Sequence, residues 1–89
     1  MRSKRTRKFR EMLRALPDDA KRQAYAAYRL FKQNPYHKSL QFKRVSQTKP
    51  LYSVRIGISY RALGQREEND LIVWIWIGSH AEYDKLLSH

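Results

Sequence analysis

Four polar side chains in the C-terminal half of the chain have the types needed for proton transfer and phosphate binding. His80 follows Gly78-Ser79 at the end of an apolar run, and histidine titrates in the range that suits proton transfer at neutral pH. Tyr83 lies three residues further on, hence on the same helix face, and could donate a proton or stack on a base. Arg55 and Arg61 can each clamp a phosphate bidentately. This set of residues has the chemical groups for moving a proton and for binding a phosphate.

The sequence leaves a simpler explanation open for each of these residues. A lone histidine after a turn is more often a capping or hydrogen-bonding residue, and Tyr83 could fill the core beside Leu86 and Leu87. The two arginines could be solvated charges on an open sheet face. The sequence shows no carboxylate pair, no Ser/His/Asp order and no phosphate-binding glycine loop. It also lacks metal-ligand spacing, since His80-x-Glu82 alone is too weak a signal for a metal site. We therefore expect no metal and no cofactor.

Charge is the most informative feature of the composition. The 89 residues include 19 Lys and Arg against 8 Asp and Glu, a net charge of +11. Residues 1–50 hold 15 basic and 3 acidic side chains, a net of +12. Such a field favours a polyanionic partner, either nucleic acid or an acidic protein. Lys43 and Arg44, together with Tyr52 and Tyr60, fit a basic surface with interleaved aromatic rings that would bind substrate.

The size and pattern predict one α+β domain over residues 1–89. With no cysteine and no apolar run near the roughly 20 residues of a membrane span, we expect a cytoplasmic protein without a membrane partner. Residues 1–8 form a basic arm that is either disordered or the ragged start of a helix. Apolar stripes predict a helix from Phe9 to Leu16, ended by Pro17, and a second from Ala20 to Phe31. Their short connection predicts an antiparallel hairpin, with Asp18 or Asp19 accepting from the opening amides of the second helix.

Strands follow the hairpin. Residues 40–45 alternate as a first paired strand, and residues 52–62 alternate as one long strand in which Gly57 could mark a bulge. On that strand Arg55 and Arg61 share a face, six residues and so roughly 20 Å apart. Residues 65–70 form the turn into Leu71–Ile77, an apolar run that predicts the central strand, buried on both faces. A short helix starts at His80. The expected fold is a helical hairpin on a twisted antiparallel sheet of three or four strands with a short C-terminal helix.

In order and spacing, these segments resemble the RelE/ParE superfamily of bacterial toxins from toxin–antitoxin pairs. The resemblance rests on five stretches: Phe9-x-x-x-Leu13-x-x-Leu16-Pro17, Leu40-x-Phe42-Lys43-Arg44, Tyr52-Ser-Val-Arg55-Ile-Gly57, Ile58-Ser-Tyr60-Arg61 and Ile77-Gly78-Ser-His80-x-x-Tyr83. It covers nearly the whole chain, although no single motif is specific. Two departures stand out. Only eight residues precede the Phe9 helix, where the family has a strand, so the resemblance implies at most a vestigial first strand in residues 1–8. No glutamate matches the base that some members use.

The resemblance implies roles for individual residues. RelE-like members cut mRNA, generally on the ribosome, and Arg61 matches the sheet arginine that contacts the scissile phosphate. His80 falls where a basic or histidine side chain follows the last strand, and Tyr83 approximates a C-terminal tyrosine. The expected activity is metal-independent mRNA cleavage, with Lys43, Arg44 and Arg55 binding substrate and an acidic antitoxin as partner. Two alternatives stay open: a ParE-like, non-enzymatic inhibitor of DNA gyrase, and a basic nucleic-acid-binding module without catalysis.

Overall fold

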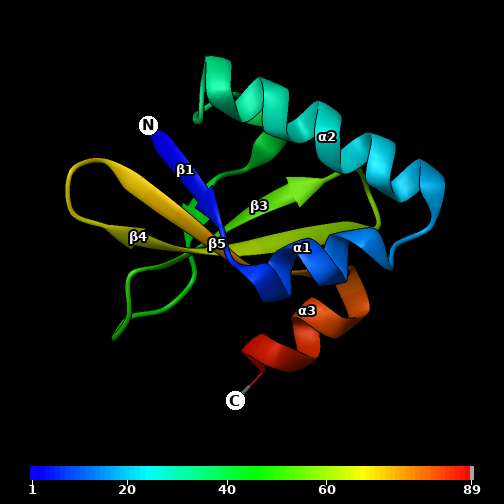
Figure 1. Cartoon of the computed structure of the whole chain (residues 1–89). Coiled ribbons are helices and arrows are strands. Elements are labelled where there is room, and N and C mark those ends of the chain that lie inside the picture. Colours follow the sequence, from blue (N-terminus) through cyan, green and yellow to red (C-terminus); the bar gives the residue numbers. More distant parts are fainter. Residues whose placement is uncertain (89) are drawn as a thin grey trace.

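The computed structural model describes residues 1–88, which form a five-stranded sheet covered by helices on both faces (Figure 1). The elements in chain order are β1 (Arg2–Arg5), α1 (Arg7–Arg14), α2 (Asp18–Gln33), a 3-10 turn (Lys38–Leu40), β2 (Lys43–Arg44), β3 (Leu51–Ile56), β4 (Tyr60–Glu67), β5 (Leu71–Ser79) and α3 (His80–Leu87). The strand order is β1-β5-β4-β3-β2. No helix among residues 1–88 is both long and apolar enough to cross a membrane.

The two predicted helices are confirmed and lie on one face of the sheet, α1 over β5 and α2 over β3 (Figure 1). Thr6 caps α1, its hydroxyl accepting from the amide of Phe9 at 3.1 Å. No side chain caps α2, so the prediction for Asp18 and Asp19 was wrong. Both instead lie in its first turn, where their charge suits the helix dipole.

The sheet has more strands than expected and is mixed rather than antiparallel. Residues 2–5 form β1, which pairs in parallel with β5 and is held by main-chain bonds from Arg2 to Asp70 and from Thr6 to Trp74. Backbone pairing, not apolar burial, makes this strand, and its exposed basic side chains protect a sheet edge from further pairing. The N-terminal arm is therefore a strand of the fold.

The predicted long strand over residues 52–62 was wrong, because it is two antiparallel strands joined by a tight turn. Gly57 lies in this turn with a φ of +59°, a left-handed conformation that side chains with a Cβ rarely adopt. It reverses the chain instead of bulging it. The first paired strand is also shorter than expected, only Lys43–Arg44, and β4 runs on to Glu67 into the predicted turn.

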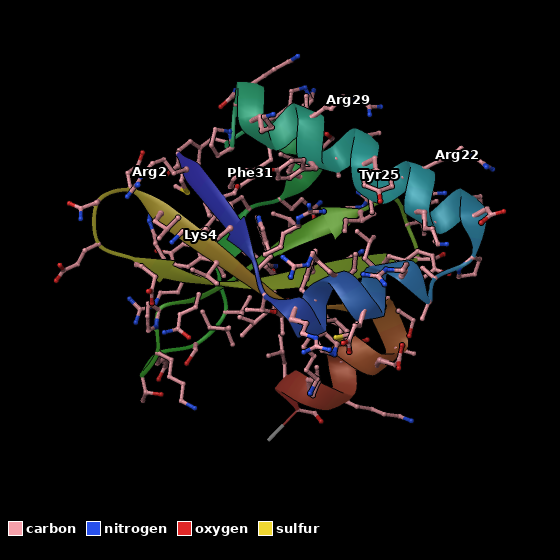
Figure 2. The ribbon with its side chains drawn as sticks, in the orientation of Figure 1. Arg2, Lys4, Arg22, Tyr25, Arg29 and Phe31 are labelled. Atoms are coloured by element: carbon pink, nitrogen blue, oxygen red, sulfur yellow. The ribbon has the colours of Figure 1, made fainter. Side chains whose placement is uncertain are left out.

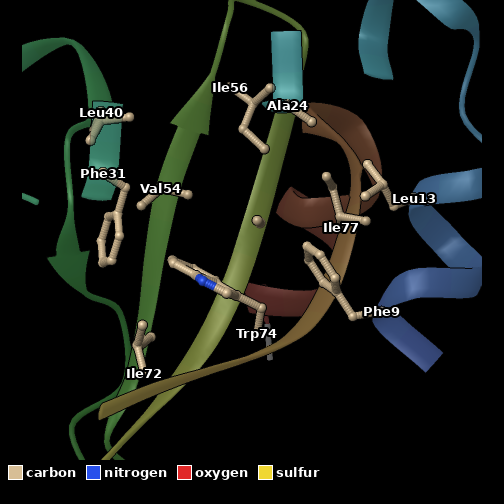
Figure 3. Packing of buried hydrophobic residues seen from close by; sticks show 11 residues of the cluster. Phe9, Leu13, Ala24, Phe31, Leu40, Val54, Ile56, Ile72, Trp74 and Ile77 are labelled. Carbon is tan, nitrogen blue, oxygen red and sulfur yellow. The ribbon is translucent and has the colours of Figure 1, made fainter. Parts of the chain in front are cut away.

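Strand β5 is confirmed as an interior strand, flanked by β1 and β4, although β4 is the middle strand of the sheet. The alternation of side chains along β5 breaks at a bulge: Trp74 pairs with Gly64 and Trp76 with Leu63, which leaves Ile75 unpaired. The bulge brings Ile77 onto the same face as Trp74, where both pack in the core under the helices (Figure 3). The edge of the Trp74 ring also meets Phe31 of α2, with centroids 5.2 Å apart.

Candidate functional site

The sheet face opposite α1 and α2 carries a concave site of about 310 Å³ between the sheet and α3. The residues that line it are Gln41, Lys43, Ser53, Arg55, Arg61, His80, Tyr83 and Asp84. Five of the six site residues predicted from the sequence therefore meet in one place. A second cavity, about 50 Å³ between the helices and the sheet, is lined almost entirely by apolar and aromatic side chains and lacks paired cations.

Arg55 and Arg61 form the floor of the site as direct cross-strand partners. The turn at Gly57 folds β4 back on β3 so that the two residues pair in register, and Cα atoms of such partners are about 4.5–5.5 Å apart. The expected separation of roughly 20 Å was therefore wrong, since it assumed one continuous strand. Both side chains lie on the same face because partners in a pair point the same way.

The two guanidinium groups are held by backbone carbonyls and not by carboxylates. Arg55 Nε donates to the carbonyl of Gly57 at 3.0 Å, and Arg61 Nη1 donates to that of Tyr60 at 2.7 Å. Neither forms an ion pair with an acidic side chain among residues 1–88. Burial and, second, the charge of Arg55 lower the pKa of Arg61 from its ordinary value. An anion between the two arginines would relieve this repulsion.

His80 is placed by its position as the first residue of α3. Its amide donates to the carbonyl of Ser59 at 2.7 Å, which ties the helix start to the β3–β4 turn. Ser79 and Glu82 form a capping box that fixes the same helix end. The ring Nδ1 of His80 lies 2.9 Å from a carboxylate oxygen of Asp84, and its centroid is 6.1 Å from that of Tyr83.

Tyr83 is almost fully buried, with 9% of its surface exposed. Its hydroxyl donates to the hydroxyl of Ser53, a buried residue of β3, at 3.1 Å. This bond anchors α3 to the sheet, so Tyr83 has the packing role that the sequence left open as an alternative. The same side chain also lines the site. To act on a substrate, its hydroxyl would have to exchange the bond to Ser53.

Lys43 and Arg44 point to opposite faces of the sheet. Lys43 pairs with Ser53, on the face of the site, whereas Arg44 pairs with Tyr52 on the other. Arg44 does not line the site, and its Nε donates to the carbonyl of Ser46 at 2.8 Å. The sequence grouped the two because they are adjacent, but neighbouring strand residues alternate in direction.

Three residues of the site did not emerge from the sequence: Gln41, Ser53 and Asp84. Asp84 had a local signal, since it lies four residues after His80 on the same helix face. Ser53 had no signal, because it looks like an ordinary polar strand residue. Gln41 had no signal either, because its position in the site depends on a left-handed conformation, with a φ of 46°, between the 3-10 turn and β2.

The site as a whole can bind a phosphate and move a proton. Lys43, Arg55 and Arg61 provide three cations around one cavity, and His80 provides an imidazole at its rim. Among residues 1–88, no three His, Asp or Glu side chains gather as they would in a metal centre.

Comparisons with known proteins bear on the family and the fold of this chain. The sequence model of the ParE-like toxin domain matches residues 18–85. A comparison with curated proteins finds no match.

Several solved structures share the fold. The RelB-RelE antitoxin-toxin complex from Methanococcus jannaschii gives a TM-score of 0.67 at 15% identity, covering 93% of this chain and 96% of that one. The RelE-RelB complex from Pyrococcus horikoshii OT3 gives a TM-score of 0.69 at 18% identity, covering 88% of this chain and 92% of that one. YafQ from Escherichia coli BL21(DE3) gives a TM-score of 0.71 at 11% identity, covering 93% of this chain and 98% of that one. With a family match over most of its length and this shared fold, the chain belongs to the RelE/ParE toxin superfamily and carries a ParE-like toxin domain.

Proposed function

We propose that this chain is the toxin of a toxin–antitoxin pair and acts as a metal-independent endoribonuclease on mRNA, working at the ribosome. The observation that carries the proposal is the Arg55–Arg61 pair, two cations that have no carboxylate partner among residues 1–88 and face the same cavity as His80. A phosphodiester of RNA supplies both the anion that the arginines lack and a 2′-hydroxyl whose proton His80 can take.

In the proposed reaction the 2′-oxygen attacks the adjacent phosphorus and the bond to the 5′-oxygen breaks. The proton of the 2′-hydroxyl passes to His80, and a proton is given to the departing 5′-oxygen by Tyr83, which first releases Ser53. The products are a 2′,3′-cyclic phosphate and a free 5′-hydroxyl. Arg61 and Arg55 stabilise the charge that grows on the phosphorane oxygens, and Lys43 holds the neighbouring backbone.

The test is single-turnover cleavage of mRNA by the purified protein, with and without ribosomes and in the presence of a chelator. We expect cleavage that survives chelation and falls roughly 10²–10⁴-fold in His80→Ala, the usual contribution of a proton-transfer group. Lys85→Ala is the matched control: it changes a charged residue on the same helix that does not line the site. Binding of RNA without cleavage would instead support a nucleic-acid-binding module.

The second candidate is a gyrase inhibitor, which the match to the ParE-like toxin domain favours. A supercoiling assay with purified DNA gyrase distinguishes the two. Gyrase inhibition without RNA cleavage would replace the ribonuclease proposal, and it would make the Arg55–Arg61 pair a surface for protein or DNA contact.

An acidic antitoxin completes the proposal. Residues 1–50 carry a net charge of +12, so their basic side chains repel one another. An acidic segment that folds on binding would reduce this repulsion. Figure 2 shows part of this basic surface, with Arg22 and Arg29 projecting from α2 and Arg2 and Lys4 along β1. Two structures of the same fold are complexes of RelE with RelB, and the one from Methanococcus jannaschii is an antitoxin-toxin complex, which supports such a partner. We expect co-purification of a small acidic protein whose affinity falls as salt rises; salt-independent binding would contradict the electrostatic part.

A further inference from the structure

We propose that Asp84 is a positioning residue for His80: its carboxylate holds the imidazole in one orientation and in the tautomer that leaves Nε2 free to accept a proton. This inference rests on the proposed ribonuclease function. The carboxylate oxygen lies 2.9 Å from Nδ1, within the distance range of a charge-assisted hydrogen bond. In the proposed arrangement Nδ1–H donates to this carboxylate. Nε2 of His80 takes part in none of the side-chain hydrogen bonds at this end of the molecule within residues 1–88.

The charges around His80 explain why a carboxylate is useful there. Lys43 on β2, Arg55 on β3 and Arg61 on β4 share its cavity, and Asp84 is the one acidic side chain among the lining residues of the described chain. Three cations oppose the positive charge that an imidazole acquires when it takes a proton. A carboxylate at Nδ1 stabilises that charge, as in the catalytic triads of hydrolases.

The position of Asp84 is unfavourable for substrate binding alone. Burial and, second, the charge of Arg55 lower the pKa of Arg61, whereas Tyr83 and, least, Asp84 raise it. A negative charge in the cavity that holds the phosphate-binding arginines repels the substrate. We therefore assign the benefit of Asp84 to the chemical step through His80 and not to substrate binding.

A purely structural role for the pair is also weak. The side chains of His80 and Asp84 are 44% and 61% exposed, and ion pairs between such exposed groups on a helix contribute little to stability. The start of α3 is already held by the Ser79–Glu82 capping box and by the bond from the His80 amide to Ser59. Removing the carboxylate therefore leaves the helix in place and changes only what the imidazole can do.

The first measurement is independent of RNA cleavage. Long-range ¹H–¹⁵N spectra of the ¹⁵N-labelled protein, recorded where His80 is neutral, report which ring nitrogen carries the proton. We expect the Nδ1–H tautomer to predominate in the wild type and to lose its predominance in Asp84→Ala. Equal tautomer populations in the two proteins would overturn the positioning role, whatever the chain does to RNA.

The second measurement separates the chemical step from binding. In single-turnover cleavage, Asp84→Asn should lower the rate roughly 10- to 100-fold, less than the loss of His80 itself, while RNA binding stays equal or tightens because a negative charge is gone. Asp18→Asn is the matched control: it removes an exposed aspartate that pairs with Lys21 on α2, outside the site. We expect wild-type rates from this variant.

A double variant identifies the route of the effect. If Asp84 acts through His80, the His80→Ala/Asp84→Asn protein is no slower than His80→Ala alone, because the losses do not add when one residue works through the other. Additive losses, or wild-type cleavage in Asp84→Asn, would overturn the proposal. A wild-type protein that shows the Nδ1–H tautomer but cuts no RNA would instead refute the ribonuclease function, and with it any catalytic use of the pair.

Discussion

Arg55 of β3 and Arg61 of β4 are cross-strand partners that share one face of the sheet without a carboxylate partner among residues 1–88. Like charges placed directly opposite each other in a sheet are destabilising, so the pair lowers the stability of the fold. This repulsion at the floor of a cavity is the physical reason for the proposal that the pair binds an anion.

The first prediction concerns this pair. Arg61→Ala should lower the cleavage rate by roughly 10²–10³, the usual cost of removing a donor to developing transition-state charge. Stability should change by less than about 0.5 kcal/mol, because the side chain leaves no core cavity and a like-charge repulsion disappears. Single-turnover cleavage and thermal melting measure the two effects. An Arg61→Ala protein that melts like the wild type and still cleaves at the full rate would place the site elsewhere.

The second prediction uses Lys43 and Arg44 as a matched pair of neighbours. Lys43→Ala should weaken RNA binding and reduce the slope of log K against log salt by about one, since one phosphate contact is lost. Arg44→Ala removes the same charge from the opposite face of the same strand and should leave both cleavage and salt slope close to wild type. Salt titrations of RNA binding check both variants. Equal effects would mean that the RNA extends over both faces.

The third prediction separates the two roles of Tyr83. Tyr83→Phe and Ser53→Ala both remove the buried hydrogen bond between the two hydroxyls. Each should lower the free energy of unfolding by about 1–3 kcal/mol, because the remaining hydroxyl is buried without its partner. Only Tyr83→Phe removes the proton donor, so only this variant should lose cleavage. Denaturant unfolding and cleavage at a temperature where both variants are folded provide the comparison. Equal cleavage in the two would leave Tyr83 with packing alone.

The fourth prediction concerns the pH dependence of α3. The Ser79 amide and, second, the Ser79 hydroxyl donate to the Glu82 carboxylate and lower the pKa of this group from its ordinary value of 4.5. A lowered pKa in the folded state means that the carboxylate adds stability above pH 4.5. This contribution is lost as the pH falls through the lower folded value.

Glu82→Gln should therefore melt below the wild type at pH 7, and the difference should narrow as the pH falls below 4.5. Ser79→Ala removes the cap from the same helix end at every pH and should cost roughly 0.5–2 kcal/mol. Melting curves of the three proteins between pH 3 and pH 7 measure the effect. A difference in melting temperature between wild type and Glu82→Gln that widens in acid would contradict the lowered pKa of Glu82.

The local pattern of apolar and polar residues predicted several elements of this fold. The unbroken apolar run from Leu71 predicted an interior strand because only a strand covered on both faces can bury both of its sides. Helical periodicity located α1 and α2, and Pro17 marked the break between them. The types of Arg55, Arg61, His80 and Tyr83 suggested the chemistry, and order and spacing suggested the family.

Only the tertiary structure decided how these residues meet. The alternation of residues 52–62 fits one strand as well as two, because a tight turn at Gly57 preserves the facing of the side chains that flank it. Whether Arg55 and Arg61 lie roughly 20 Å apart or opposite each other depends on the chain reversal there, which period-2 patterning does not encode. The same holds for β1, whose basic residues become a strand only because β5 offers a parallel edge. It also holds for the bulge at Ile75, which pairing with β4 creates and which brings Ile77 into the core.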